Sequence, residues 1–211
     1  LSVRVTQPAK QQKTCLIIGV FEDGSLTSTA KEINRMSEGA LATLIQQGRF
    51  QAKIGQTLSL FDFAHSPFTH ILLVGCGKTT KPLTPPGFRK LVICAIKALV
   101  TTKATQATCY LSELEVDGQS LAWRVKQITE AAWDGRYRFD LFKTEKEPIV
   151  LKEMIIHVPD EKQQKHCEVA LKQGQAIADG VIAMLKGAAS ELVAGDTADI
   201  ATDVGPVIDA E

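Results

Sequence analysis

Six short runs of apolar and β-branched residues punctuate the chain, and they constrain its fold more than any other feature. Several of them, such as CLIIGV and HILLVGCG, are apolar at consecutive positions. Runs of this kind are typical of strands that other layers cover on both faces. The sequence therefore predicts a buried sheet, with strands at residues 2–6, 14–20, 56–61, 70–77, 106–111 and 152–158.

Helical spacing fills the intervals between these predicted strands. Apolar residues recur at intervals of three and four over residues 33–44, 88–99 and 121–132. This spacing places apolar side chains along one face of a helix. Because strands and helices alternate along the chain, we predict an α/β fold of three layers.

A fourth helical pattern starts near Cys167 and reaches Leu185 without a break. Gly187 follows, and glycine is a common residue at a helix end. The charge balance also changes here: residues 181–211 hold one lysine and six acidic residues, whereas the whole chain holds 24 basic and 24 acidic residues. We therefore expect the helix to end at Gly187 and an exposed acidic arm or loop to follow.

Basic residues without acidic neighbours form the best candidate binding surface. No acidic residue lies between Asp62 and Glu113. Lys90 and Lys97 are seven residues apart, so they share a helix face. Such a cluster would contact the phosphates of double-stranded DNA without reading bases. The alternative is a solvated helix face. The candidate DNA-binding residues are Lys78, Lys81, Arg89, Lys90, Lys97 and Lys103.

Other chemistry is weakly indicated. The run HILLVGCGK brings two glycines and Lys78 to a strand end, where they could bind a phosphate, but it matches neither a Walker loop nor a dinucleotide motif. A tight turn is the alternative interpretation. The four histidines form no HExxH motif, and no Gly-x-Ser-x-Gly elbow is present. We therefore assign no catalytic and no metal-binding residue.

Composition limits the class of protein. With 211 residues and 45% hydrophobic residues, the chain can bury one good core. No apolar run approaches the roughly 20 residues that cross a bilayer, and no secretion signal is recognisable at the start. The five cysteines are widely spaced and mostly lie in apolar runs, as reduced, buried thiols do. We expect a globular cytoplasmic protein with no membrane contact.

The segments TCLIIGVFEDGSL, EINRMSEGALATLIQQGRFQAKIGQTLSL, ILLVGCGK, CYLSELEVDG and GQAIADGV together resemble the N-terminal domain of bacterial leucyl aminopeptidases, most closely the aminopeptidase A group. The resemblance covers about residues 1–183. It implies a macro-domain-like fold, with a mixed sheet between helices. It also implies a homo-hexameric parent enzyme that uses two divalent metal ions, zinc or manganese, to release N-terminal amino acids from peptides.

The metal ligands of that family lie in segments similar to GKGITFDSGG and NTDAEGR, which this sequence does not contain. The resemblance therefore implies that this chain alone is inactive and holds no cofactor. Residues 184–211 instead resemble a piece of the aldehyde dehydrogenase part of the bifunctional proline-utilisation enzyme. We therefore predict two parts, an aminopeptidase N-terminal α/β domain at 1–183 and an unrelated acidic C-terminal arm at 184–211, joined by fusion or gene rearrangement.

Three functions follow as alternatives. The first is a non-catalytic domain of an aminopeptidase. The second, which the resemblance to aminopeptidase A also implies, is a DNA-binding module acting in site-specific recombination or transcriptional regulation. The third is a macro-domain-type binder of ADP-ribose, which rests on fold analogy alone.

Overall fold

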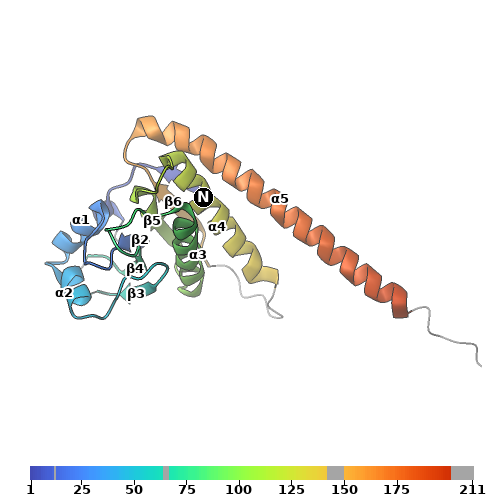
Figure 1. Cartoon of the computed structure of the whole chain (residues 1–211), viewed down its shortest axis with the longest axis horizontal. Coiled ribbons are helices and arrows are strands. Elements are labelled where there is room, and N and C mark those ends of the chain that lie inside the picture. The colour runs from blue at the N-terminus through green and yellow to red at the C-terminus, as the bar shows by residue number, and fades with distance from the viewer. Residues whose placement is uncertain (12, 64–66, 142–149, 201–211) are drawn as a thin grey trace, which may run out of the picture.

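The structure is a computed structural model of the whole chain, drawn in Figure 1. It describes all residues except 12, 64–66, 142–149 and 201–211. For residues 136–141 and 186–200, which end two helices, it describes the backbone only.

A mixed sheet of six strands forms the middle layer. Its strand order is β1-β6-β5-β2-β4-β3, and only the pair of β3 with β4 is antiparallel. All six strands lie within the predicted runs, so the predicted mixed sheet is confirmed. The strands are β1 (Ser2–Arg4), β2 (Cys15–Val20), β3 (Thr57–Phe61), β4 (His70–Gly75), β5 (Gln106–Cys109) and β6 (Glu153–His157).

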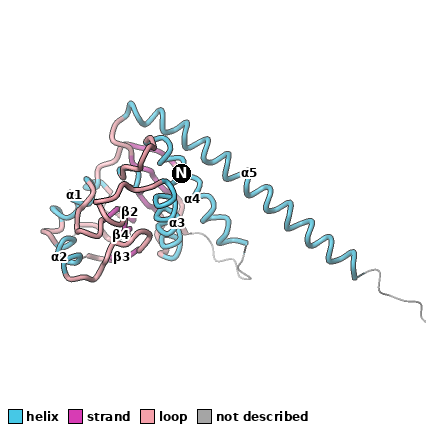
Figure 2. Tube along the Cα trace, viewed as in Figure 1, coloured by secondary structure: helices cyan, strands magenta, loops and turns pink. Residues whose placement is uncertain are grey.

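Helices cover both faces of this sheet (Figures 1 and 2). In the part of the chain that the structure describes, two helices lie on one face and three lie on the other, and two short 3-10 helices follow β1 and β5. Polar caps mark helix starts: the Thr84 hydroxyl accepts from the Gly87 amide just before two prolines open α3. The helices are α1 (Ser28–Met36), α2 (Ala40–Gln46), α3 (Pro85–Thr101), α4 (Leu121–Leu141) and α5 (Glu161–Ile200), with η1 (Pro8–Lys10) and η2 (Leu111–Glu113).

Two apolar cores follow from the alternation of side chains along the strands. Leu16 and Ile18 of β2 pack with Ile33 of α1 on one face of the sheet. Ile17 points the other way and packs with Phe88 of α3 and other residues of that layer. The predicted three-layer α/β architecture is therefore confirmed.

The predicted helical stretch over residues 33–44 is two helices. Gly39 adopts a left-handed conformation with φ of 82° and starts α2. The Asn34 side chain at the end of α1 accepts from the amide of Ala42, which fixes the angle between the helices. The apolar spacing continues across the break because both helices pack on the same face of the sheet.

The prediction that the last helix ends at Gly187 is wrong. The backbone of α5 is helical from Glu161 to Ile200. One glycine inside a helix costs only about 1 kcal/mol relative to alanine, and the alanines next to Gly187 favour helix. The expected arm or loop is therefore helical as far as residue 200, and residues 201–211 lie outside the described part.

The five cysteines are free thiols, and four of them are buried, as predicted. Burial raises the pKa of Cys15, Cys76 and Cys109 to about 12. Among the described residues, no helix is both long enough and apolar enough to cross a membrane.

Candidate functional site

The six predicted basic residues follow α3 from one end to the other. Lys78 and Lys81 lie in the loop before α3, and Lys103 lies in the turn after it, with a positive φ of 31°. Arg89, Lys90 and Lys97 lie on the exposed face of the helix. Because α3 has 17 residues, about 25 Å separate its ends. The six residues therefore form a strip and not a compact patch.

Arg89 is partly committed to contacts with α4. Its Nε donates to Oε1 of Gln127, and its guanidinium lies 5.6 Å from the ring centre of Trp123. Gln127 in turn donates to Glu130 at 3.0 Å. An arginine that is stacked and hydrogen-bonded in this way has less freedom to contact a phosphate than Lys90, which is exposed.

The folded chain places acidic residues next to the strip, although none lies within that part of the sequence. A carboxylate oxygen of Glu22 lies 3.9 Å from where a Cβ atom on Gly77 would be, and the Thr79 hydroxyl donates to the Asp23 carboxylate. Asp134 of α4 lines the same groove as Lys97. These carboxylates lower the positive potential at both places. A stretch without acidic residues in the sequence is therefore not a surface without acidic residues.

Lys53 is a basic residue near the strip that the sequence analysis did not single out. It is exposed, and it belongs to a segment that packs against the end of β4 and the start of α3. In that segment, the Gly55 amide donates to the Gly75 carbonyl at 3.0 Å, and Ile54 contacts Gly87. Its distance along the chain from Lys78 hides this neighbourhood in the sequence.

The glycines before Lys78 are explained by packing. A Cβ atom on Gly75 would lie 2.1 Å from the carbonyl oxygen of Lys53, and one on Gly77 would lie 2.6 Å from Ile54. Gly77 also has a positive φ of 78°. The turn therefore needs glycine at both positions for close approach of the Lys53 segment, which supports the tight-turn interpretation over phosphate binding.

An open apolar groove of about 300 Å³ lies on the surface between α3 and α4. Gly135 brings the two helices together beside it, because a Cβ atom there would lie 2.5 Å from Cγ2 of Ile96. The groove is lined by Ile93, Ile96, Lys97, Val100, Thr101, Ala131, Asp134 and Gly135. Its walls are mostly aliphatic, with one basic and one acidic side chain among them.

A second candidate site lies where β2 and β5 end. These strands are parallel neighbours, but after β2 the chain continues to β3 and β4 on one side, and after β5 it continues to β6 on the other. Ligands of open α/β sheets bind at such switch points. Here Glu113 occupies the position: its carboxylate accepts from the Thr29 amide at 3.1 Å and from the Thr29 hydroxyl. The first turn of α1 is thus bound by a carboxylate of the chain itself.

His157 and Tyr110 extend this cluster. The Thr6 amide donates to Nδ1 of His157 at 3.3 Å, and the Thr6 hydroxyl donates to the Tyr110 hydroxyl at 3.1 Å. An amide can only donate, so Nδ1 is an acceptor and the proton of the neutral ring is on Nε2. That atom lies 3.9 Å from Oε1 of Glu113.

Burial perturbs the titration of these groups. It raises the pKa of the Glu113 carboxyl, although the hydrogen bonds from Thr29 act in the opposite direction and the charge of Glu32 adds to the increase. Burial lowers the pKa of His157 and raises that of Tyr110 to about 12. Shifted pKa values of this kind accompany functional sites and also structural networks. The sequence analysis missed the cluster because its members come from four separate segments.

The polar groups of the Glu113 and His157 cluster are used in hydrogen bonds that connect elements of the chain. The Ser112 hydroxyl donates to the His157 carbonyl at 2.6 Å, so the cluster ties η2, β6, α1 and the end of β1 together. Across the described ranges, no group of three or more histidine, cysteine, aspartate or glutamate side chains is arranged to hold a metal ion.

Comparison with known sequences shows which family this chain is similar to. Residues 17–146 match the cytosol aminopeptidase family, N-terminal domain. A probable cytosol aminopeptidase of Psychromonas ingrahamii is 37% identical over 181 residues, which is 85% of this chain and 36% of that protein. Its counterpart in Colwellia psychrerythraea is 36% identical over 182 residues, with the same coverage. The chain thus spans about a third of the length of these relatives.

Solved structures agree on the fold. A mutant of tomato leucine aminopeptidase superposes with a TM-score of 0.64 at 20% identity, over 86% of this chain and 36% of that one. The macrodomain of Thermus aquaticus DarG superposes with a TM-score of 0.54 at 13% identity, over 75% of this chain and 97% of that one. The expected macro-domain-like fold is confirmed.

Proposed function

The chain belongs to the cytosol aminopeptidase family, of which it carries the N-terminal domain, and from this premise we propose that it acts as a supporting domain without peptidase activity of its own. The family match over residues 17–146 carries this proposal. The bonding at the switch point supports it, because the polar groups of Glu113 and His157 hold elements of the chain together. A supporting domain needs rigidity there more than free catalytic groups.

A peptidase assay tests the proposal directly. The purified chain is incubated with leucine p-nitroanilide and either zinc or manganese ions, with a full-length cytosol aminopeptidase as the positive control. We expect no release of nitroaniline above the rate without protein. Turnover that depends on the added metal and disappears with a chelator would contradict the proposal.

We propose further properties for the whole protein of which such a domain is part. These are release of N-terminal amino acids from peptides, a homo-hexamer, two zinc or manganese ions bound by segments that this sequence does not contain, and a cytoplasmic location. The family match supports them.

The division of the chain at residues 183 and 184 remains a proposal. α5 runs across this position as one helix. The change in charge supports a junction, but neither the aldehyde dehydrogenase resemblance nor a fusion is supported by the comparisons. Sequencing the source locus tests it: an uninterrupted aminopeptidase reading frame that encodes residues 184–211 in place would exclude a fusion.

Binding of double-stranded DNA is the second candidate function. The observation that favours it is the exposed face of α3, which carries Arg89, Lys90 and Lys97 and no acidic residue. Replacing Lys90 and Lys97 by glutamine should weaken duplex binding and reduce its salt dependence by about one unit of slope per lost phosphate contact. A matched Lys162→Gln, Lys165→Gln variant, changed on the exposed start of α5, serves as the control. Equal titrations for both variants would exclude this surface.

A further inference from the structure

The two edge strands of the sheet differ in how they are protected against pairing with another chain. β1, at one edge, has three residues, and its Arg4 forms an ion pair with Glu153 at 3.3 Å. β3, at the other edge, has five residues, TLSLF, with neither a charge nor a proline. Short strands, charged side chains and prolines are the usual protection of a sheet edge. β3 therefore lacks the features that prevent an edge strand from pairing further.

The backbone of β3 has hydrogen-bonding groups that point away from the sheet. Among the described residues, β3 pairs with β4 alone. Just outside its two ends, the Gly75 amide donates to the Gln56 carbonyl at 2.8 Å, and the Asp62 amide donates to the Thr69 carbonyl at 3.0 Å. Bonded positions alternate along an antiparallel strand, so the even-numbered residues of β3 bond to β4. The N–H and C=O groups that face outward belong to Thr57, Ser59 and Phe61.

The side chains at this outer edge are mostly apolar on both faces of the sheet. Phe61 is 60% exposed, although its ring stacks on His70 of β4 with the ring centres 4.3 Å apart. Leu58 and Leu60 point to the other face, where they pack against the core of α1 and α2 but are only partly buried. A strand added beyond β3 would cover the open side of all three.

We propose that β3 pairs antiparallel with β3 of a second copy of this chain, with a twofold axis at Ser59. This register places Ser59 opposite itself, Thr57 opposite Phe61 and Leu58 opposite Leu60. The outward N–H and C=O groups of one strand then meet the outward groups of the other. A displacement by one residue would set these groups opposite residues that are already bonded to β4.

The side-chain pairs of this register favour a second copy over an unrelated extended peptide. Leu58 and Leu60 would form pairs without mutual hydrogen bonds, in which the side chains are closest. Phe61 would face Thr57, and pairs of an aromatic with a β-branched residue are stabilising. No like charges would meet, because the strand carries none. A second copy thus supplies a strand of matching length, register and side chains.

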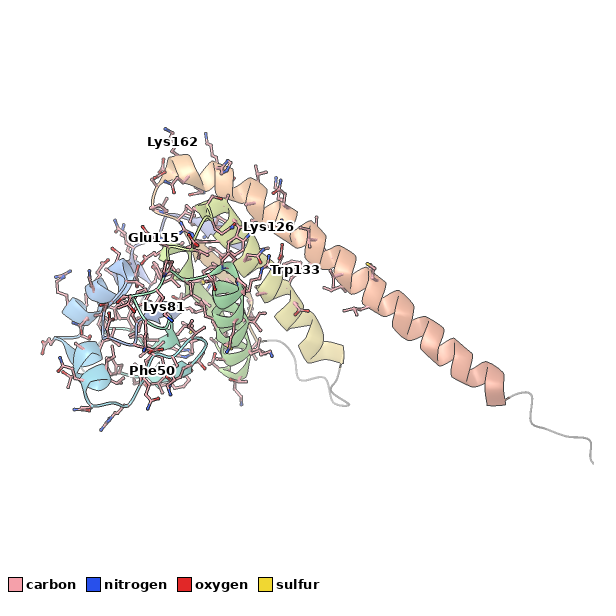
Figure 3. The ribbon with its side chains drawn as sticks, viewed as in Figure 1. Phe50, Lys81, Glu115, Lys126, Trp133 and Lys162 are labelled. Atoms are coloured by element: carbon pink, nitrogen blue, oxygen red, sulfur yellow. The ribbon has the colours of Figure 1, made fainter. Side chains whose placement is uncertain are left out.

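The position of β3 in the domain suits such a pair. α5 packs beside β1, at the opposite edge of the sheet. Figures 1 and 2 show β3 at the lower border of the domain, and the side chains drawn in Figure 3 surround it. Two copies would form one sheet with six strands from each. One strand edge is small compared with the roughly 1,200–2,000 Å² of stable interfaces, so the dimer should form at micromolar concentrations and dissociate on dilution.

Sedimentation equilibrium of the full chain, from low to high micromolar concentration, tests the proposal. We expect a reversible monomer–dimer equilibrium. Ser59→Pro removes an N–H group that faces outward, which an edge strand tolerates, but it removes the central bonds of the dimer. The dissociation constant should increase at least about tenfold. Ser59→Thr keeps the N–H group and suits a strand, so it is the matched control and should not weaken the dimer.

A pair of charge variants tests the register independently of proline. Ser59→Lys and Ser59→Glu each place like charges directly opposite in a dimer of one variant, which should weaken it. An equimolar mixture should form a heterodimer at least about tenfold tighter than either dimer alone. Met184→Glu is the control for a contact elsewhere, because Met184 is 77% exposed on α5 and its replacement should change nothing.

Hydrogen exchange measured by NMR identifies the strand involved. The amides of Thr57, Ser59 and Phe61 should gain protection as the concentration rises, whereas those of Leu58 and Leu60 should be protected throughout. A chain that stays monomeric at every concentration overturns the proposal. So does a dimer that Ser59→Pro leaves unchanged, that Met184→Glu weakens equally, or that the mixture of charge variants fails to restore. Each of these results leaves the proposed supporting role intact, since peptidase activity tests that role.

Discussion

The carboxyl edge of the sheet and the far half of α5 satisfy their side chains in opposite ways. At the edge, Glu113 accepts hydrogen bonds from Thr29 and His157 accepts one from Thr6, so polar groups of different segments are bonded within the chain. Along α5, Val181 and Leu185 continue a stripe whose first half is buried, yet they are nearly half exposed. The edge is thus an internally bonded part of the domain, whereas this part of the helix leaves apolar side chains exposed.

Two glycine substitutions should give opposite results in these regions, and the first has the largest expected effect. Gly75→Ala places a Cβ atom 2.1 Å from a backbone oxygen of the Lys53 segment, which has to move. We expect a loss of about 3 kcal/mol in the free energy of unfolding, measured by urea denaturation. A loss below about 1 kcal/mol would show that the segment adapts and that the edge is less rigid than described.

Removing the Glu113 carboxylate should have the next largest effect. Glu113→Ala leaves the Thr29 amide and hydroxyl without their acceptor in a half-buried place, and we expect a loss of about 1–3 kcal/mol in the free energy of unfolding. Glu115→Ala is the matched control: Glu115 is exposed two residues away, and its removal should change stability by no more than about 0.5 kcal/mol. Equal losses for the two variants would mean that Glu113 does not hold the edge together.

In α5 the corresponding glycine change should stabilise the protein. A Cβ atom on Gly180 would have no neighbour within 4 Å. Gly180→Ala should therefore add up to about 1 kcal/mol through higher helix propensity, seen as increased helical circular dichroism and a higher urea midpoint. A loss of stability would contradict the open surroundings of Gly180.

The smallest effect concerns the charge of Glu113. Its pKa is raised in the folded state, so folding favours the protonated form. The contribution of this carboxyl to stability is present below its ordinary pKa of 4.5 and is lost as the pH rises through the higher folded value. Glu113→Gln keeps the shape without the charge, so the stability of the wild type relative to this variant should decrease with pH above about 4.5.

Urea denaturation of both proteins at a series of pH values measures that difference. A difference that increases with pH would reverse the assigned direction of the shift. His157 has a lowered pKa, so it destabilises the folded state as the pH falls below about 6.5 in both proteins, and this contribution largely cancels in the comparison.

Most of the fold could be predicted because its signals are local. The strands were identified from runs such as CLIIGV, and α3 from the prolines and spacing that begin it. The helix end at Gly187 was mispredicted because a single glycine carries too little free energy to stop a helix. The switch-point cluster could not be predicted, since Thr29 and Glu113 are 84 residues apart and neither belongs to a motif.

The surroundings of the candidate basic residues likewise depend on contacts between distant segments, which the sequence does not show. The spacing of Lys90 and Lys97 correctly placed both on the outer face of one helix. The sequence could not show that Asp23 would approach the loop of Lys78, or that Arg89 would stack on Trp123. Whether an electrostatic surface forms depends on the folded arrangement of distant segments.

The buried thiols allow the unfolding of this protein to be followed by alkylation. Only thiolates react with iodoacetamide, and Cys15, Cys76 and Cys109, with a pKa of about 12, carry almost no thiolate at pH 8 while the domain is closed. The rate at which carbamidomethyl groups are added to these three cysteines therefore reports the fraction of molecules whose interior is open. Peptide mass spectrometry over time would measure that rate at each cysteine separately, with no dye or engineered label.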